Sequence, residues 1–310
     1  MGFVLLLYAL FASVFTIAKT GLEFSQPFFF VGTRMALAGV ILLSYYYWKN
    51  GSHISLKTLR WWKIIRLAAF NIYLTNVFEF WGLKYLTSFK ACLIYSLSPF
   101  VSALLSYFIF SERITWRKWL GLGVGCLGLM PVLLNITSQE ERSGHFFFLS
   151  GAELAVILAA ICSVYGWILL RQLVKDEGYS PILANGLSML IGGIMSLTHS
   201  RLVENWDPLP VTHYVPFLEC SILLIVISNL ICYNLYGTLL KKYSATFMSF
   251  AGFTTPFFTA LFGWAYLGEV VAWPFYLSTL ILFLGLLLFY QEELQRETAI
   301  STLPTPVEGN

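Results

Sequence analysis

Charged side chains are scarce in this sequence of 310 residues, where Asp, Glu, Lys and Arg take 11% of the positions and hydrophobic types take 58%. A soluble domain is about one quarter charged, so this composition excludes a water-soluble globule. The stretches 91–111 and 243–268 contain no charge at all. Each is long enough to cross a hydrocarbon layer of about 30 Å. The sequence therefore predicts an all-α integral membrane protein that contacts lipid along most of its length.

Patterns for metals, cofactors and catalysis are also missing. The five cysteines form no C-x-x-C pair and the four histidines fall in polar connections, so we expect no metal site and no cofactor. The two aspartates, Asp176 and Asp207, lie outside the apolar stretches. Neither a carboxylate cluster nor an intramembrane His–Asp pair is found, and a phosphate-binding G-x-x-x-x-G-K-[ST] motif is absent. We therefore expect no enzyme, and the net charge of +3 gives no sign of nucleic-acid binding.

Hydropathy and helix-ending residues predict ten membrane-spanning helices. They cover 2–19, 28–48, 64–82, 88–110, 116–135, 149–170, 181–198, 215–238, 245–267 and 272–290. An even number places both termini on one side, where the connections hold twelve Lys and Arg residues against five on the other side. The positive-inside bias therefore predicts cytoplasmic termini. Residues 292–310, rich in Glu, Thr and Pro, are predicted to form a disordered cytoplasmic tail.

An internal repeat is the most informative pattern in the chain. A shift of 157 residues aligns Ser-Pro-Phe at 98–100 with Thr-Pro-Phe at 255–257. The same shift pairs Leu83, Lys84, Glu112, Trp116 and Gly128 with Leu240, Lys241, Glu269, Trp273 and Gly285. The chain is thus predicted to contain two five-helix halves, 1–136 and 147–291. Because five is odd, the halves would cross the membrane in opposite senses, a plan typical of alternating-access carriers.

Two prolines occupy equivalent positions in the halves. Pro99 and Pro256 fall in the middle of the predicted helices 88–110 and 245–267. Proline removes a backbone hydrogen bond, so each predicts a kink that frees carbonyls toward a cavity. A moving hinge and a fixed packing kink are both consistent with this pattern.

The segment SFKACLIYSLSPF at 88–100, followed by SERITWRKWLG at 111–121, resembles the EamA module of the drug/metabolite transporter superfamily. Residues 244–285 resemble a second copy. The resemblance implies ten helices, cytoplasmic termini, a bacterial inner membrane and transport of a small molecule. It does not fix the substrate, because members carry amino acids, sugar derivatives, nucleotides or cationic drugs.

Charges inside spans are costly and are therefore candidates for function. Arg34, Glu79 and Lys90 form this set. An ion pair between Arg34 and Glu79 is the structural alternative, and for Lys90 the alternative is a side chain that extends to the lipid headgroups.

Uncharged polar and aromatic side chains supply the other candidates. They are spaced to share faces of predicted helices, and they comprise Asn76, Tyr95, Tyr165, Trp167, Asn229 and Tyr233. A substrate cavity is one interpretation, and hydrogen bonds that join helices are the other. Gly121 and Gly125 have small-xxx-small spacing, which fits either a homodimer face or close packing of neighbouring helices.

These side chains suit a zwitterion with an aromatic or cationic part. A cation binds carboxylate, Glu79 suits an ammonium, and aromatic faces attract cations and flat rings. Amino acids fit this description, and so does S-adenosylmethionine. The chain is similar in plan to the S-adenosylmethionine/S-adenosylhomocysteine carriers of intracellular bacteria, so exchange of these compounds by a secondary carrier is the predicted function. The alternatives are an amino-acid or drug exporter and, from other classes, a membrane-embedded enzyme or a scaffold.

Overall fold

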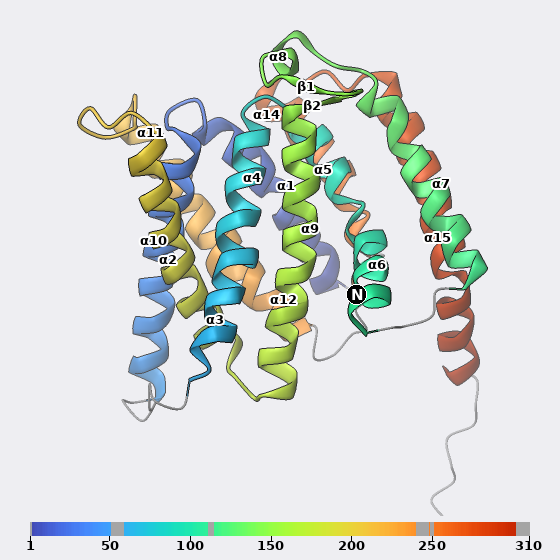
Figure 1. Ribbon diagram of the computed structural model, residues 1–310, viewed down its shortest axis with the longest axis horizontal. Helices are drawn as coiled ribbons and strands as arrows, with labels where there is room; N and C mark the ends of the chain where they lie inside the picture. The colour runs from blue at the N-terminus through green and yellow to red at the C-terminus, as the bar shows by residue number, and fades with distance from the viewer. Residues whose placement is uncertain (1, 51–58, 111–114, 240–247, 249–250, 302–310) are drawn as a thin grey trace, which may run out of the picture.

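The computed structural model describes residues 2–50, 59–110, 115–239, 248 and 251–301. Within these residues the chain forms a bundle of long helices with one small hairpin (Figure 1). The first half contains α1 (Gly2–Gly21), α2 (Pro27–Asn50), α3 (Trp61–Leu67), the π-helical segment η2 (Ala68–Leu74), α4 (Thr75–Leu83), α5 (Ser88–Tyr95), α6 (Ser98–Phe110) and α7 (Trp116–Leu133).

A connection and the second half follow. The connection holds α8 (Ser138–Glu141), β1 (His145–Phe146) and β2 (Leu149–Ser150), and the two strands pair antiparallel. The second half contains α9 (Gly151–Arg171), the π-helical segments η3 (Gln172–Asp176) and η4 (Ile225–Cys232), α10 (Pro181–Val203), α11 (Tyr214–Leu224), α12 (Tyr233–Leu239), α14 (Thr255–Leu267) and α15 (Trp273–Ser301).

Within the described residues, seven helical stretches are long and apolar enough to cross a membrane. They are Gly2–Gly21, Pro27–Asn50, Ser88–Leu105, Gly151–Asp176, Pro181–Val203, Tyr214–Leu239 and Trp273–Gln291. The other three predicted spans are helical over Trp61–Leu83, Trp116–Leu133 and Thr255–Leu267, and residues 245–247 and 249–250 of the ninth lie outside the described chain. A multi-pass membrane protein is confirmed, and the count of ten spans stays a prediction.

Two helix pairs run side by side along most of their length, α2 with α10 and α7 with α15 (Figure 1). Glycine permits the second approach, because a Cβ on Gly121 would lie 2.7 Å from the carbonyl oxygen of Gly285. The face of Gly125 is covered by the Phe100 ring. The Gly121 and Gly125 spacing on α7 is therefore used inside the chain, against α15 and α6, and the homodimer stays a prediction.

The two central π-helical segments occupy equivalent positions in the two halves. Segment η2 begins at residue 68 and η4 at residue 225, which is the 157-residue offset of the sequence repeat. A π turn carries an extra residue, so some side chains bond carbonyls five residues back. The Thr75 hydroxyl donates to the Phe70 carbonyl at 2.7 Å, and the Asn234 amide donates to the Asn229 carbonyl at 3.2 Å.

Both proline-containing spans are interrupted where the sequence predicted kinks. The helix of the first half stops at Tyr95 and restarts at Ser98, and α14 of the second half starts at Thr255 after a turn at 253–254. Pro99 and Pro256 are each the second residue of the restarted helix. Proline is tolerated there because the first-turn N–H groups lack helical partners. The prediction of mid-helix kinks is thus corrected to breaks.

The C-terminal helix is longer than predicted. Helix α15 continues to Ser301, so residues 292–301 are helical where a disordered tail was expected. Residues 302–310 of the predicted tail lie outside the described chain.

Charged side chains tie together the end of the bundle that carries α8 and the hairpin, which is at the top of Figure 1. The Glu269 carboxylate accepts hydrogen bonds from the Ser88 backbone N–H at 2.8 Å and from its hydroxyl at 2.6 Å, so it caps α5. Lys19 Nζ donates to the Leu83 carbonyl at 2.8 Å, at the end of α4. Contacts between distant parts of the chain therefore close this end.

Candidate functional site

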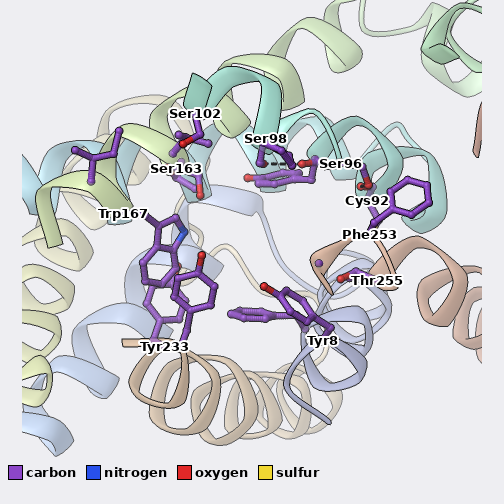
Figure 2. A pocket seen from close by; sticks show the side chains of 18 of the residues that line it. Tyr8, Cys92, Ser96, Ser98, Ser102, Ser163, Trp167, Tyr233, Phe253 and Thr255 are labelled. Atoms are coloured by element: carbon purple, nitrogen blue, oxygen red, sulfur yellow. Dashed lines mark hydrogen bonds between the residues drawn. The ribbon is translucent and has the colours of Figure 1, made fainter. Parts of the chain in front are cut away.

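A cavity of about 700 Å³ lies inside the bundle, between α1, α2, α4, α5, α6, α9, α12, α14 and α15 (Figure 2). At one end it is lined by the charged side chains of Lys118, Arg171, Lys175 and Asp176, and the last three are exposed to solvent. This end is its mouth. It lies at the opposite end of the bundle from α8 and the hairpin (Figure 1). The volume is in the range of small-molecule sites.

Arg34 of α2 projects into the deep part of the cavity. Its side chain is 1% exposed, and its guanidinium lies 4.4 Å from the centroid of the Phe80 ring. Nη2 donates to the Asn76 side-chain oxygen at 2.6 Å. Nε and Nη1 are buried without a hydrogen-bond partner among the described residues. A buried cation with unused donors is costly, and Arg34 is one of the residues that line the cavity.

Glu79 of α4 lies in the same deep part. Its carboxylate accepts a hydrogen bond from the Tyr95 hydroxyl at 2.8 Å, and both side chains line the cavity. The ion pairs of the described chain do not include Arg34 with Glu79, so the predicted alternative of an ion pair between them is not observed. The two charges face the same space without neutralising each other directly.

Five aromatic rings form one side of the cavity, which we call the aromatic wall. It consists of Tyr8 and Phe11 of α1, Trp167 of α9, and Tyr233 and Tyr236 of α12. Adjacent ring centroids are 6.4 Å apart for Tyr8 and Phe11, 6.3 Å for Phe11 and Tyr236, 4.6 Å for Tyr236 and Trp167, and 5.1 Å for Trp167 and Tyr233. The wall is therefore continuous across three helices.

Small hydroxyl side chains form another side, which we call the hydroxyl wall. Its members are Ser96, Ser98, Ser102, Ser163 and Thr255. Three of them, Ser96, Ser98 and Thr255, lie at the interruptions in the two proline-containing spans, and Figure 2 shows the serines along the top of the cavity with Trp167 and Tyr233 at the left. The Ser98 hydroxyl donates to the Tyr95 carbonyl at 2.6 Å, and the helical donor to that carbonyl would be the backbone N–H that Pro99 lacks.

The structure brings together six of the predicted site residues and Pro99. The cavity is lined by Arg34, Asn76, Glu79, Tyr95, Trp167 and Tyr233. Tyr165 instead accepts a hydrogen bond from Arg66 and packs on Phe70. Asn229 is buried with its amide 3.0 Å from the Met35 sulfur. Pro256 is buried at the start of α14, next to the cavity-lining Thr255.

Lys90 is also placed outside the cavity, which corrects its predicted role. Its Nζ lies 2.6 Å from a Glu140 carboxylate oxygen and 2.8 Å from one of Glu153, and it donates to the Asn135 carbonyl at 3.1 Å. Its side chain is 4% exposed, so it does not extend to headgroups either. Lys90 ties α5 to α8 and to the start of α9.

Sequence reasoning missed Tyr8, Phe11 and most of the hydroxyl wall. One usable signal existed, because Ser98 and Thr255 are equivalent in the repeat and both precede the paired prolines. Tyr8 and Phe11 carried no signal beyond helical spacing in an apolar span. Within the described chain no cluster of three or more His, Cys, Asp or Glu is arranged to hold a metal ion.

Comparison with known proteins defines the class. The model of the EamA-like transporter family matches residues 1–134 and 150–291, and the chain belongs to this family. It is 39% identical to the S-adenosylmethionine/S-adenosylhomocysteine transporter of Chlamydia muridarum (strain MoPn / Nigg), over 94% of this chain and 92% of that protein. It is 38% identical to the transporter of the same name from Chlamydia trachomatis serovar L2, over 93% of this chain and 88% of that protein.

Two more distant proteins are also similar, one in sequence and one in fold. Protein PecM of Dickeya dadantii (strain 3937) is 23% identical over 74% of this chain and 75% of its own. A protein of known crystal structure superposes with a TM-score of 0.63 at 16% identity, over 93% of this chain and 95% of the other. The family model and the two chlamydial relatives confirm the resemblance to a membrane transporter family over nearly the whole chain.

Proposed function

We propose that this transporter exchanges S-adenosylmethionine for S-adenosylhomocysteine across a bacterial inner membrane by alternating access. The observation that carries the proposal is Arg34, buried at the deep end of the cavity with two unpartnered donors. The names of the two chlamydial relatives supply the substrate class. An amino-acid headgroup supplies the charges that this end of the cavity lacks.

The amino-acid end of either substrate fits the charged end of the cavity. Its carboxylate takes the free N–H groups of Arg34, for which a guanidinium offers paired donors in a planar fork. Its ammonium is attracted by the Glu79 carboxylate, which Tyr95 holds through its hydrogen bond. Each group of the zwitterion then compensates one buried charge that the empty cavity leaves without an ionic partner.

The adenosine end fits the rest of the cavity. Purine rings stack on aromatic side chains, and the aromatic wall runs from the charged end to Tyr8. The ribose hydroxyls are donors and acceptors that suit the hydroxyl wall across the cavity. The two walls therefore give a flat ring and a sugar separate surfaces.

The architecture supports exchange between two sides of a membrane. The cavity has its mouth at one end. The opposite end is closed by the Glu269 carboxylate, which caps the start of α5, and by the ion pairs of Lys90 with Glu140 and Glu153. We assign the mouth to the cytoplasm, on the positive-inside bias of the connections. In the proposed ten-span arrangement, two inverted five-helix halves would exchange conformations to open the other end.

Counterflow in proteoliposomes tests this function. Vesicles loaded with unlabelled S-adenosylhomocysteine should accumulate labelled S-adenosylmethionine, and vesicles loaded with buffer should not. Protein-free vesicles with the same load are the matched control for leakage. Uptake that does not depend on the internal substrate would rule out exchange.

An amino-acid or drug exporter is the second candidate, and one observation favours it. The charged end made by Arg34 and Glu79 would bind a free amino acid without any use of the walls. Loading the vesicles with amino acids or with a lipophilic cation separates these cases. If such a load drives uptake of its labelled counterpart while S-adenosyl compounds fail, the second candidate is correct.

A further inference from the structure

The aromatic wall is adjacent to the charged end of the cavity. The Tyr233 ring is buried, and Tyr233 lines the cavity together with Glu79 and Arg34. Trp167 is its next neighbour in the wall, with ring centroids 5.1 Å apart. Tyr236 follows at 4.6 Å from Trp167. The wall therefore has an order that starts at the charged end: Tyr233, Trp167, Tyr236, and then the rings of α1.

The chemical groups of the two proposed substrates follow one another in a matching order: amino-acid end, sulfur and adenosine. In both, two methylene groups separate the α-carbon from the sulfur, and the adenosine follows the sulfur. With the amino-acid end on Arg34 and Glu79, the sulfur lies beside the first rings of the wall. In S-adenosylmethionine this sulfur is a methylated sulfonium with a positive charge, and in S-adenosylhomocysteine it is a neutral thioether.

The sulfonium has no carboxylate partner available inside the cavity. The acidic side chains that line the described cavity are Glu79, which the α-ammonium uses, and Asp176, which is exposed at the mouth. Aromatic faces are then the surfaces that attract a cation in this position, and Trp is the best of them. Trp167 also lies between two other rings, which hold its face in place.

We infer that Trp167 and Tyr233 form a sulfonium subsite that distinguishes S-adenosylmethionine from S-adenosylhomocysteine. This inference rests on the proposed function and adds to it the means of discrimination. A cation on a desolvated ring gains about 1–2 kcal/mol, which corresponds to about 5- to 30-fold in affinity. The thioether gains no such term, because it has no charge.

Equilibrium binding to the purified full chain tests the subsite. Trp167→Leu removes the π face of the indole. It should lower the affinity for S-adenosylmethionine about 5- to 30-fold and leave the affinity for S-adenosylhomocysteine within about twofold of the wild-type value. Trp167→Phe is the conservative variant and should give a smaller selective loss. An analogue with a protonated amine in place of the sulfonium should follow S-adenosylmethionine, since the ring responds to charge.

Phe11→Leu is the matched control, since Phe11 belongs to the same wall but lies beyond Tyr236. There the ligand presents its adenosine, which the two compounds share. This variant should weaken both by a similar factor. If Phe11→Leu lowers the preference for S-adenosylmethionine over S-adenosylhomocysteine as much as Trp167→Leu does, the proposed sulfonium subsite is wrong.

A series of fluorinated tryptophans placed at position 167 covers the case in which Trp167→Leu fails to fold. Each added fluorine weakens the ring's attraction for a cation with little change of shape. Affinity for S-adenosylmethionine should fall stepwise along the series, while that for S-adenosylhomocysteine should not. Parallel changes for both ligands, or none, overturn the inference and leave the proposed function intact. If the wild-type chain binds neither compound, both the sulfonium subsite and the proposed exchange function are wrong.

Discussion

Two buried cations in this transporter have opposite surroundings. Lys90 and Arg34 are 3% and 1% exposed, so both are removed from water. Lys90 is surrounded by two carboxylates and a carbonyl within 3.1 Å. Arg34 has one hydrogen bond, to Asn76, and two donors without a partner. Both were candidates for substrate binding on the same sequence evidence, an intramembrane charge.

The difference between them shows how a structural charge differs from a binding charge. Burial is costly for either cation, and at Lys90 the fold itself provides the compensation. At Arg34 the compensation is incomplete, and the residue lines a cavity. An orphaned donor in a cavity is thus stronger evidence for function than the burial of a charge alone. Four substitutions test this contrast.

The largest effect is expected for Lys90→Met. The variant leaves the carboxylates of Glu140 and Glu153 buried without their cation, and breaking such a cluster costs about 3–5 kcal/mol. Thermal melting in detergent should show a large loss of stability or no folded protein. The triple variant with Glu140→Gln and Glu153→Gln should recover much of it. A single variant that melts like the wild type would contradict the assigned clamp.

Glu79→Gln should abolish exchange and leave the protein folded. The change keeps the size of the side chain and its acceptor for Tyr95, but it removes the carboxylate that attracts the substrate ammonium. Counterflow measures transport, and size-exclusion chromatography with thermal melting measures folding. Exchange at the wild-type rate would show that Glu79 has no part in binding.

Arg34→Gln should lower substrate affinity about 10- to 100-fold, since hydrogen bonds to charged groups contribute about 1.5–3 kcal/mol. Its melting temperature should stay near that of the wild type or rise, because an undercompensated cation has been removed. Isothermal titration and melting curves provide both values. Arg34→Lys is the control, and it should be intermediate because an ammonium keeps the charge and loses the planar fork. Strong destabilisation with unchanged affinity would make Arg34 a structural residue like Lys90.

Tyr95→Phe should have the smallest effect. It removes one hydrogen bond to the Glu79 carboxylate, and such a bond to a charged group contributes about 1.5–3 kcal/mol. Only part of this reaches the substrate, because Tyr95 acts through Glu79. We expect a two- to tenfold loss of affinity, measured by the same titration, with the maximal exchange rate retained. A loss as large as that of Glu79→Gln would mean that the Tyr95 hydroxyl binds the substrate directly.

Much of the bundle and part of the site followed from the sequence alone. Helix positions followed from hydropathy, and the paired prolines marked the interruptions. The partners of Lys90 could not be predicted, because Glu140 and Glu153 lie in and beside a connection whose path is set by tertiary packing. The side chains that the eighth predicted span, 215–238, turns toward the cavity could not be predicted either. Regular α spacing puts Asn229 on the face of Tyr233, but the π turn between them brings Ser228 to the cavity instead.

The matching π-helical segments also contain a record of how this chain arose. Segments η2 and η4 lie 157 residues apart, at the offset that relates the two halves of the sequence. Two independent insertions at one equivalent position would be a coincidence. The simplest history is that the widened turn already existed in an ancestor of half the length and was copied when its gene was duplicated. On this history, the irregular turn is older than the cavity that the two halves now enclose.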